Sequence, residues 1–246
     1  MIQKMFLTDI YNFFKADGDI YETKALARNP KITVFIAFTY ILLTKWLIPW
    51  ILEKRKPLEI KRTILIYNFL VGLLNGILAC MAIIATAENW KNRCTVETIP
   101  KQQIHVFFAL RKKKNQLTFL HVFHHSANVL LFGFGFYIRT TDFVCLFGTA
   151  INTSIHVVMY SYYALASIGP HMQKYLWWKK YLTLLQIIQF VVILSYSLYG
   201  FVTGCENFGR FKITFYIFVT LILVLFINFY TKSYHAKNTP SNYKVY

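Results

Sequence analysis

Three histidines lie along one helical stripe inside a long apolar stretch of the sequence. His121, His124 and His125 occupy positions i, i+3 and i+4, which share one face of a helix. Ionisable side chains are costly in hydrocarbon, and inside a membrane span they are candidates for function. A neutral imidazole can act as nucleophile or base, while neighbouring imidazoles or hydroxyls stabilise an oxyanion. The spacing therefore predicts a histidine site suited to acyl transfer.

Other apolar stretches carry polar side chains at helical spacing and at similar depth. With a rise of 1.5 Å per residue, His121 and His156 lie about 6 and 15 Å below the cytosolic ends of their helices. Packing between helices remains the alternative role for Gln186, Gln189 and Asn75. We expect a polar chamber lined by His121, His124, His125, His156, Asn152, Tyr160, Tyr163, Gln186, Gln189, Tyr67, Asn68 and Asn75.

A metal site is the second chemistry that histidines suggest, since imidazole is the commonest transition-metal ligand. Membrane di-iron enzymes need about eight histidines in several boxes, whereas this chain has seven in total and four in the chamber. No carboxylate lies near those four, so we expect no metal, although a mononuclear site stays open.

Cys80 and Cys145 lie toward the opposite membrane face, which leaves histidine to carry any acyl group.

The elements that position these residues are transmembrane helices. The chain has 246 residues, of which 56% are hydrophobic, and this is too apolar for a soluble domain. A spanning helix needs about 20 apolar residues, and six stretches satisfy this: 31–52, 64–87, 117–138, 143–166, 181–203 and 211–230. A seventh at 98–110 is short, because Pro100 and the polar residues after it interrupt it. We expect an all-α, multi-pass bundle of seven spans that forms one membrane domain over residues 1–246.

The net charge of +17 indicates membrane topology rather than nucleic-acid binding, since the basic residues lie in short loops between apolar stretches. With seven spans, the positive-inside rule places residues 53–62, 111–114, 167–180 and the tail 231–246 in the cytosol, and the N-terminal segment 1–30 in the lumen. With six spans the N-terminus would be cytosolic. In both arrangements residues 111–114, 174–180 and the tail share the cytosolic side.

Two cysteines fall in loops on the non-cytosolic side. Cys94 follows the second apolar stretch and Cys205 follows the fifth. That compartment is oxidising. The sequence therefore allows a disulfide between Cys94 and Cys205 without requiring it.

The motifs resemble those of the very-long-chain fatty-acid elongases, the ELO family. The segment 110–125, LRKKKNQLTFLHVFHH, is similar to the basic loop and HxxHH box of that family. The segment 152–165, NTSIHVVMYSYYAL, and the segment 169–190, GPHMQKYLWWKKYLTLLQIIQF, resemble its second and third signatures. Tyr67 and Asn68 resemble its YN pair.

This resemblance implies a seven-helix protein of the endoplasmic reticulum membrane that encloses an acyl-CoA tunnel. It would condense a long-chain acyl-CoA with malonyl-CoA to a 3-ketoacyl-CoA and carbon dioxide, without a cofactor. It would assemble with itself or with other enzymes of the elongation cycle. His124 would accept the acyl group, His156 would assist, and His121 and His125 would orient the ring or exchange protons. Polar contacts to the substrates would come from Asn152, Tyr160, Gln186 and Gln189, and contacts to coenzyme A phosphates from Arg111, Lys112, Lys179 and Lys180.

One segment departs from the family pattern. The family carries an SKxxExxDT block ahead of the basic loop, whereas residues 97–105 read ETIPKQQIH and lack both acids. Two hypotheses follow: a condensing enzyme, or an impaired family member that binds acyl-CoA or assembles with active elongases. A seven-helix receptor would not explain three histidines on one stripe, and a di-iron oxygenase would retain iron on purification.

Overall fold

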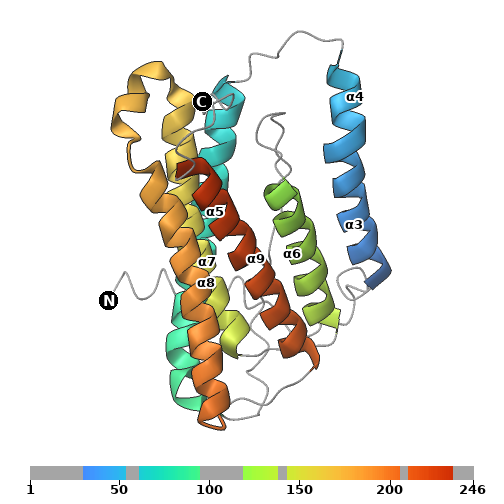
Figure 1. Ribbon diagram of the computed structural model, residues 1–246, viewed down its shortest axis with the longest axis vertical. Coiled ribbons are helices and arrows are strands. Elements are labelled where there is room, and N and C mark those ends of the chain that lie inside the picture. Colours follow the sequence, from blue (N-terminus) through green and yellow to red (C-terminus); the bar gives the residue numbers. More distant parts are fainter. Residues whose placement is uncertain (1–29, 54–60, 95–118, 138–142, 206–209, 235–246) are drawn as a thin grey trace, which may run out of the picture.

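The computed structural model describes residues 30–53, 61–94, 119–137, 143–205 and 210–234 (Figure 1). This part of the chain is helical and contains no strand, which confirms the all-α prediction. The helices are α3 (Pro30–Leu42), η1 (Leu43–Leu47), α4 (Ile48–Leu52), α5 (Lys61–Asn89), η2 (Trp90–Asn92), α6 (Phe119–Tyr137), α7 (Phe143–Ile168), η4 (Pro170–Tyr175), α8 (Lys179–Val202) and α9 (Arg210–Tyr234).

Five segments are long and apolar enough to cross a membrane: Pro30–Ile51, Lys61–Asn92, Phe143–Ile168, Lys179–Val202 and Phe211–Tyr234. The chain is therefore a multi-pass helical membrane protein. Helix α6 is not among the five, and its 19 residues include the three histidines of the stripe and Asn128. The short span expected at 98–110 lies outside the described residues.

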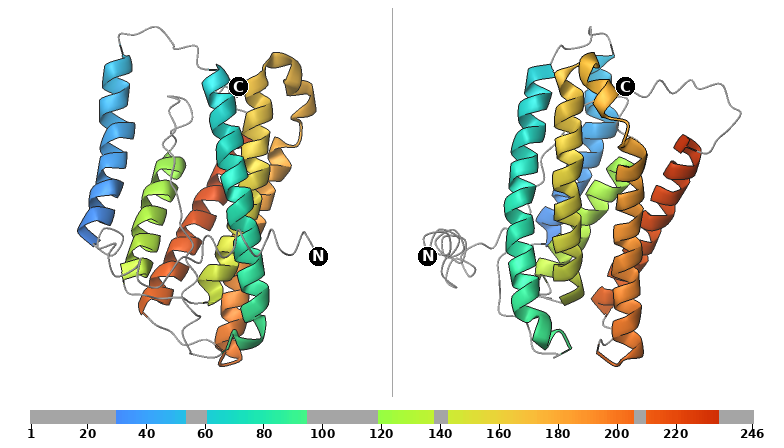
Figure 2. Two further views of the ribbon diagram at one scale, coloured as in Figure 1. Left: turned by 180° about the vertical axis from the view of Figure 1, so that it is seen from behind. Right: turned by 90° about the vertical axis from the view of Figure 1, so that its left-hand side faces the viewer.

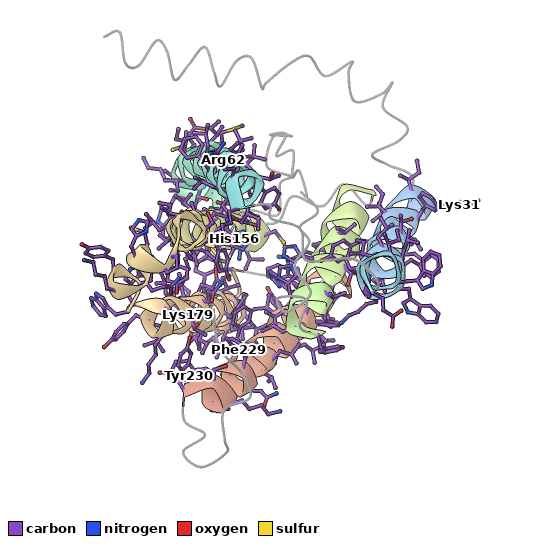
Figure 3. The ribbon with its side chains drawn as sticks, turned by 90° about the horizontal axis from the view of Figure 1, so that it is seen from above. Lys31, Arg62, His156, Lys179, Phe229 and Tyr230 are labelled. Atoms are coloured by element: carbon purple, nitrogen blue, oxygen red, sulfur yellow. A yellow bond between two sulfur atoms is a disulfide. The ribbon has the colours of Figure 1, made fainter. Side chains whose placement is uncertain are left out.

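The helices pack in the order α5, α7, α8, α9, α6, α3. Viewed along the bundle, this order forms an arc that curves from α5 round to α3 (Figure 3). Figure 2 shows α5 lying beside α7 over most of its length, while α3 lies at the opposite edge of the bundle. Helix α6 lies between α3 and α9, so both flanks of the histidine-bearing helix are covered.

Neighbouring helices in the arc are antiparallel. Gly72 of α5 lies against Tyr160 of α7 and Gly76 against Val157, so the residue numbers run in opposite directions. Consequently α5 and α6, which follow each other in the chain, run in the same direction (Figure 1). Two helices that follow each other in the chain run parallel when one further span connects them, so this direction agrees with the prediction of seven spans. The number of spans itself stays a prediction, because 98–110 is not described.

A proline explains the one irregular span. Pro49 has no N–H and its ring crowds the carbonyl of Lys45, so a regular helix cannot continue through it. The chain widens into the π-helical turn η1 just before this point. Thr44 stabilises the start of that turn, because its hydroxyl donates to the carbonyl oxygens of Tyr40 at 2.7 Å and Ile41 at 3.2 Å.

The contact between α3 and α6 is unusually close. The α3 residues Thr33, Ala37 and Thr44 are small and buried, at spacings of four and seven residues that keep them on one side of the helix. Gly133 of α6 lies directly against the Thr33 side chain, and a Cβ atom at position 133 would collide with it. Small residues are what allow membrane helices to approach each other closely.

The core of the bundle lies between α6, α7, α8 and α9. It is formed by Leu131, Val144, Phe190, Ile193, Phe215, Val219 and Ile222. Hydroxyl side chains in these helices are satisfied locally: Ser126 donates to the carbonyl of Val122 at 2.8 Å, and Ser197 donates to that of Ile193 at 2.8 Å. Such bonds within one helix satisfy polar groups where water is absent.

Cys94 and Cys205 form a disulfide, with Cα atoms 4.5 Å apart. The sequence allowed this pair without requiring it. Cys94 follows η2 and Cys205 follows α8, so the bond joins the ends of two helices that both contact α7. Gly204 makes the turn into Cys205 possible, since its φ of 70° is strained for residues that carry a Cβ.

Loss of the disulfide should destabilise the protein. The bond joins residues 111 positions apart and so restricts the unfolded chain. We expect Cys94→Ser or Cys205→Ser to lower the free energy of unfolding by about 2–4 kcal/mol. The thermal midpoint in detergent measures this. Cys80→Ser, at an exposed free thiol, is the matched control and should leave the midpoint unchanged; equal midpoints for all variants would show that the bond does not stabilise the bundle.

Close packing of α3 on α6 should permit a second covalent link. A Cβ built on Gly133 lies 3.0 Å from Thr33 Cβ, slightly closer than the Cβ separation of about 3.5–4.5 Å in disulfides. The double variant Thr33→Cys with Gly133→Cys should therefore cross-link on mild oxidation, and protease digestion followed by mass spectrometry detects the linked peptides. The control pair is Phe38→Cys with Gly133→Cys, made together with Thr33→Ala so that the new Cβ at position 133 does not collide with the Thr33 side chain; Phe38 is exposed. Cross-linking of the control pair alone would contradict the observed register.

Candidate active site

The histidine stripe lies in the first half of α6, as the spacing predicted. The ring centroids of His121 and His125 are 4.4 Å apart, and those of His124 and His125 are 5.6 Å apart. All three side chains are partly buried. Because i, i+3 and i+4 positions project from one face, the three rings form a contiguous imidazole surface.

His124 is enclosed by uncharged groups. Its ring stacks against Phe218 of α9 and meets the ring of Phe226 edge-on, each at a centroid distance of 6.4 Å. The side-chain nitrogen of Asn128, one turn further along α6, lies 3.1 Å from His124 Nε2. This hydrogen bond and the two phenylalanines restrain the orientation of the imidazole.

Asn128 is a site residue that the sequence analysis did not single out. Its position, four residues after His124 and seven after His121, continues the histidine stripe. The same spacing rule that identified the histidines could have found it, because residues i and i+4 are neighbours on a helix.

His156 approaches the stripe from α7. It interacts electrostatically with His124 and His125, which are on a different helix. Figure 3 shows His156 on the part of α7 that lies within the curve of the arc. Its ring meets that of Tyr160 edge-on at 6.0 Å, and Tyr160 meets Tyr163 at 6.4 Å. The structure thus brings His156 and Tyr160 to one polar row on α7, next to the imidazoles of α6.

The polar residues that we expected on α7 and α8 make hydrogen bonds between these two helices. Asn152 donates its amide to Gln189 at 3.3 Å, and Gln186 donates to the Met159 sulfur at 3.4 Å. Gln189 is only 3% exposed. These contacts join α7 to α8 at the depth of His156, so they hold the wall of the site in register.

On α5 the polar residues differ in environment. The Asn75 amide donates to the carbonyl of Val71 in its own helix at 2.8 Å, which agrees with a role in the helix itself. Asn68 is completely buried, and within the described part of the chain neither its Nδ2 nor its Oδ1 atom has a hydrogen-bond partner.

The basic residues expected to meet phosphates are only partly described. Lys179 is half-buried at the start of α8, while Lys180 is exposed and its Nζ lies 5.8 Å from the centre of the Tyr230 ring on α9. Figure 3 shows Lys179 and Tyr230 on these two neighbouring helices. Arg111 and Lys112 lie outside the described residues, so no phosphate site can be assembled from all four.

Taken together, the geometry defines a multi-pass helical membrane protein with a site formed by imidazole rings. Across the described ranges, no three His, Cys, Asp or Glu side chains are grouped to hold a metal ion. The rings, hydroxyls and amides that do converge suit proton transfer or nucleophilic attack by neutral imidazole.

Comparison with known proteins identifies the family. The chain matches the GNS1/SUR4 family (ELO) over residues 25–106 and 104–242. It is 32% identical over 260 residues to very long chain fatty acid elongase 4 of Homo sapiens, covering 95% of this chain and 82% of that protein. It is 31% identical over 250 residues to elongase 7 of Rattus norvegicus (91% and 88%), and 36% identical over 190 residues to elongase F of Drosophila melanogaster (68% and 74%). The chain belongs to the ELO family.

The family match also locates the departure from the pattern. The two matched segments meet at residues 104–106, within the stretch where the expected third span is short. The helices with the histidine site, α6 to α9, lie wholly inside the second matched segment. The described residues that form the histidine site therefore lie together in one matched segment, residues 104–242.

Removing the Asn128 amide should loosen His124. The hydrogen bond occupies Nε2, so Asn128→Leu should raise the rate at which diethyl pyrocarbonate modifies His124 by roughly 2- to 10-fold, as expected for one net hydrogen bond. Mass spectrometry of digested protein measures the modification. Asn75→Leu is the matched control, because that amide bonds within α5 and should leave His124 unaffected. An equal rate in wild type and Asn128→Leu would show that the bond does not restrain the ring.

Proposed function

We propose that this protein is a condensing enzyme of very-long-chain fatty-acid elongation. It joins a long-chain acyl-CoA to malonyl-CoA, and the products are a 3-ketoacyl-CoA, carbon dioxide and free coenzyme A. The observation that carries the proposal is the contiguous surface of three imidazole rings, His121, His124 and His125, on α6, with His156 of α7 close enough to act on His124 electrostatically. Membership of a family whose members are named very long chain fatty acid elongases supports it.

In the proposed first step, a neutral His124 nitrogen attacks the thioester carbonyl carbon of acyl-CoA. The carbon–sulfur bond breaks, and the leaving thiolate takes the proton that the acylated imidazole loses. His125, whose ring contacts those of both His124 and His121, and His156 of α7 are the proposed relay for that proton. Neutral imidazole is the nucleophilic form, and the aromatic surroundings of His124 favour it because burial penalises the charged form.

In the proposed second step, malonyl-CoA loses its carboxylate as carbon dioxide. The electron pair left on carbon attacks the acyl carbon, and the bond to His124 breaks. The released imidazole nitrogen takes up one proton, so the cycle consumes a single proton and needs neither metal nor cofactor. Asn152, Tyr160, Gln186 and Gln189 form the wall of the site in this scheme, with Asn152 and Gln189 holding α7 against α8.

We propose the orientation in the membrane from the balance of basic residues between the two ends of the bundle. In the described residues, one end carries Lys31, Lys91, Arg93, Arg210 and Lys212, and the end where α5 and α8 begin and α9 finishes carries Lys61, Arg62, Lys174, Lys179, Lys180 and Lys232. By the positive-inside rule we assign this end and the C-terminus to the cytosol.

We further propose that the membrane is the endoplasmic reticulum and that Arg111, Lys112, Lys179 and Lys180 meet coenzyme A phosphates. An acyl tunnel, a homodimer and contacts with other elongation enzymes belong to the same proposal.

A second candidate is an impaired ELO member that binds acyl-CoA or partners active elongases. The absence of both family acids from residues 97–105 favours it. This candidate retains affinity for acyl-CoA but forms no carbon–carbon bond.

The test is condensation in microsomes from a host that lacks its own elongases. Labelled malonyl-CoA is supplied with a panel of C16 to C22 acyl-CoAs, and 3-ketoacyl product is measured for wild type, His124→Ala and His171→Ala. We expect His124→Ala to lower the rate by roughly 100-fold or more. His171 is exposed in η4, so its replacement should leave the rate unchanged.

The outcomes separate the two candidates. Equal rates for wild type and His124→Ala would exclude the histidine mechanism. No product from any variant, together with retained binding of a labelled acyl-CoA, would favour the impaired member. Mass spectrometry of wild type incubated with acyl-CoA alone should detect the acyl group on His124, and its absence from an active enzyme would exclude the covalent step.

A further inference from the structure

One aromatic side chain of α3 contacts the histidine stripe. The Tyr40 ring lies 6.3 Å from the His125 ring, centroid to centroid, with the planes tilted by 56°. His125 in turn contacts both His121 and His124. Tyr40 is therefore two ring contacts away from His124, although its helix is the first of the described chain and α6 comes much later.

The packing of α3 delivers this ring to the site. Thr33, Ala37, Tyr40 and Thr44 follow one another at spacings of four, three and four residues, so they share the side that faces α6. Tyr40 is the only large side chain among them. The aromatic residues on the other sides of the same span, Phe35, Phe38 and Trp46, are 68%, 58% and 75% exposed.

The helix that carries Tyr40 packs closely on α6. Toward the start of α3, the close contact between Thr33 and Gly133 fixes the distance between the two helices. One turn after Tyr40, Thr44 is buried on the same side of α3, and its hydroxyl donates to the Tyr40 carbonyl oxygen at 2.7 Å within the helix. The contact at Thr33, two turns before Tyr40, therefore sets how far this side of α3 lies from α6.

We propose that Tyr40 is a positioning residue for His125. Its ring covers one side of the imidazole and holds it at the angle at which it also meets His121 and His124. Aromatic ring pairs at 4.5–7 Å stabilise each other beyond the area they bury, by amounts that correspond to about a 2- to 10-fold change in an equilibrium. The inference can be tested in two ways. A kinetic test rests on the proposed condensation reaction, whereas chemical modification of His125 does not.

The kinetic test compares Tyr40→Leu, Tyr40→Phe and the control Phe38→Leu in the labelled malonyl-CoA assay. The contact is between rings, so Tyr40→Phe should behave like wild type. Tyr40→Leu should lower kcat about tenfold and leave KM for both substrates within about twofold. Phe38→Leu removes an exposed aromatic residue of the same helix and should change neither constant. Loss of kcat in Tyr40→Phe equal to that in Tyr40→Leu would overturn the proposal, because the ring alone would then not suffice.

The chemical test does not depend on condensation. Diethyl pyrocarbonate should modify His125 at least about threefold faster in Tyr40→Leu than in wild type, with Tyr40→Phe and Phe38→Leu unchanged. If the protein forms no product, this arm still decides whether Tyr40 restrains His125, so failure of the proposed function and failure of this inference are distinguishable. An unchanged His125 rate in Tyr40→Leu would overturn it. Tyr40→Met, which also lacks a ring but has a flexible, unbranched side chain that adapts to its neighbours, replaces the Leu variant if that variant does not accumulate in the membrane.

Discussion

A helix that carries three imidazoles and an amide cannot expose them to lipid, and the arrangement of the bundle follows from this constraint. Polar side chains within a span face other helices because hydrocarbon offers no hydrogen-bond partner. Helix α6 is accordingly covered by α3 on one flank and α9 on the other. The rings of Phe218, Phe226 and Tyr40 lie against its histidines, and His156 approaches from α7. The site is thus made by the helices that shield α6.

The remaining helices fix where α7 presents His156. Helix α5 lies along α7, with Gly72 beside Tyr160 and Gly76 beside Val157, and the Asn152–Gln189 bond sets α8 against the other side of α7. The Cys94–Cys205 bond then joins the ends of α5 and α8. Helix α7 is consequently held from both sides, and its polar row cannot slide relative to α5 and α8 without breaking these contacts.

The sequence predicted what depends on periodicity within one segment. The spans at 143–166 and 181–203 agree with α7 and α8 to within two residues, and the histidine stripe lies on one face of α6 as expected. Asn128 was missed, although its i+4 spacing from His124 could have predicted its place in the site. The contact of Tyr40 with His125 could not be predicted from the sequence, because it depends on the register between α3 and α6, which are not neighbours in the chain. For the same reason the sequence placed Asn152 and Gln189 at one depth without showing that they bond each other.

Residues 97–105 lack the two acids of the family pattern, which raises the question of whether the histidines need a carboxylate to orient them. The groups that contact the imidazole rings answer it. A carboxylate beside a histidine in a medium of low dielectric stabilises the imidazolium form, which cannot act as a nucleophile. Within the described ranges the acidic residues are Glu53 and Glu88, both near the ends of spans and away from the stripe. His124 and His125 are instead held by an amide and by aromatic rings. Such uncharged groups can fix the angle of a ring without favouring its protonation. For nucleophilic attack by His124, an acid near the stripe is therefore not a physical requirement, and the missing acids favour the impaired candidate only through a step other than this attack.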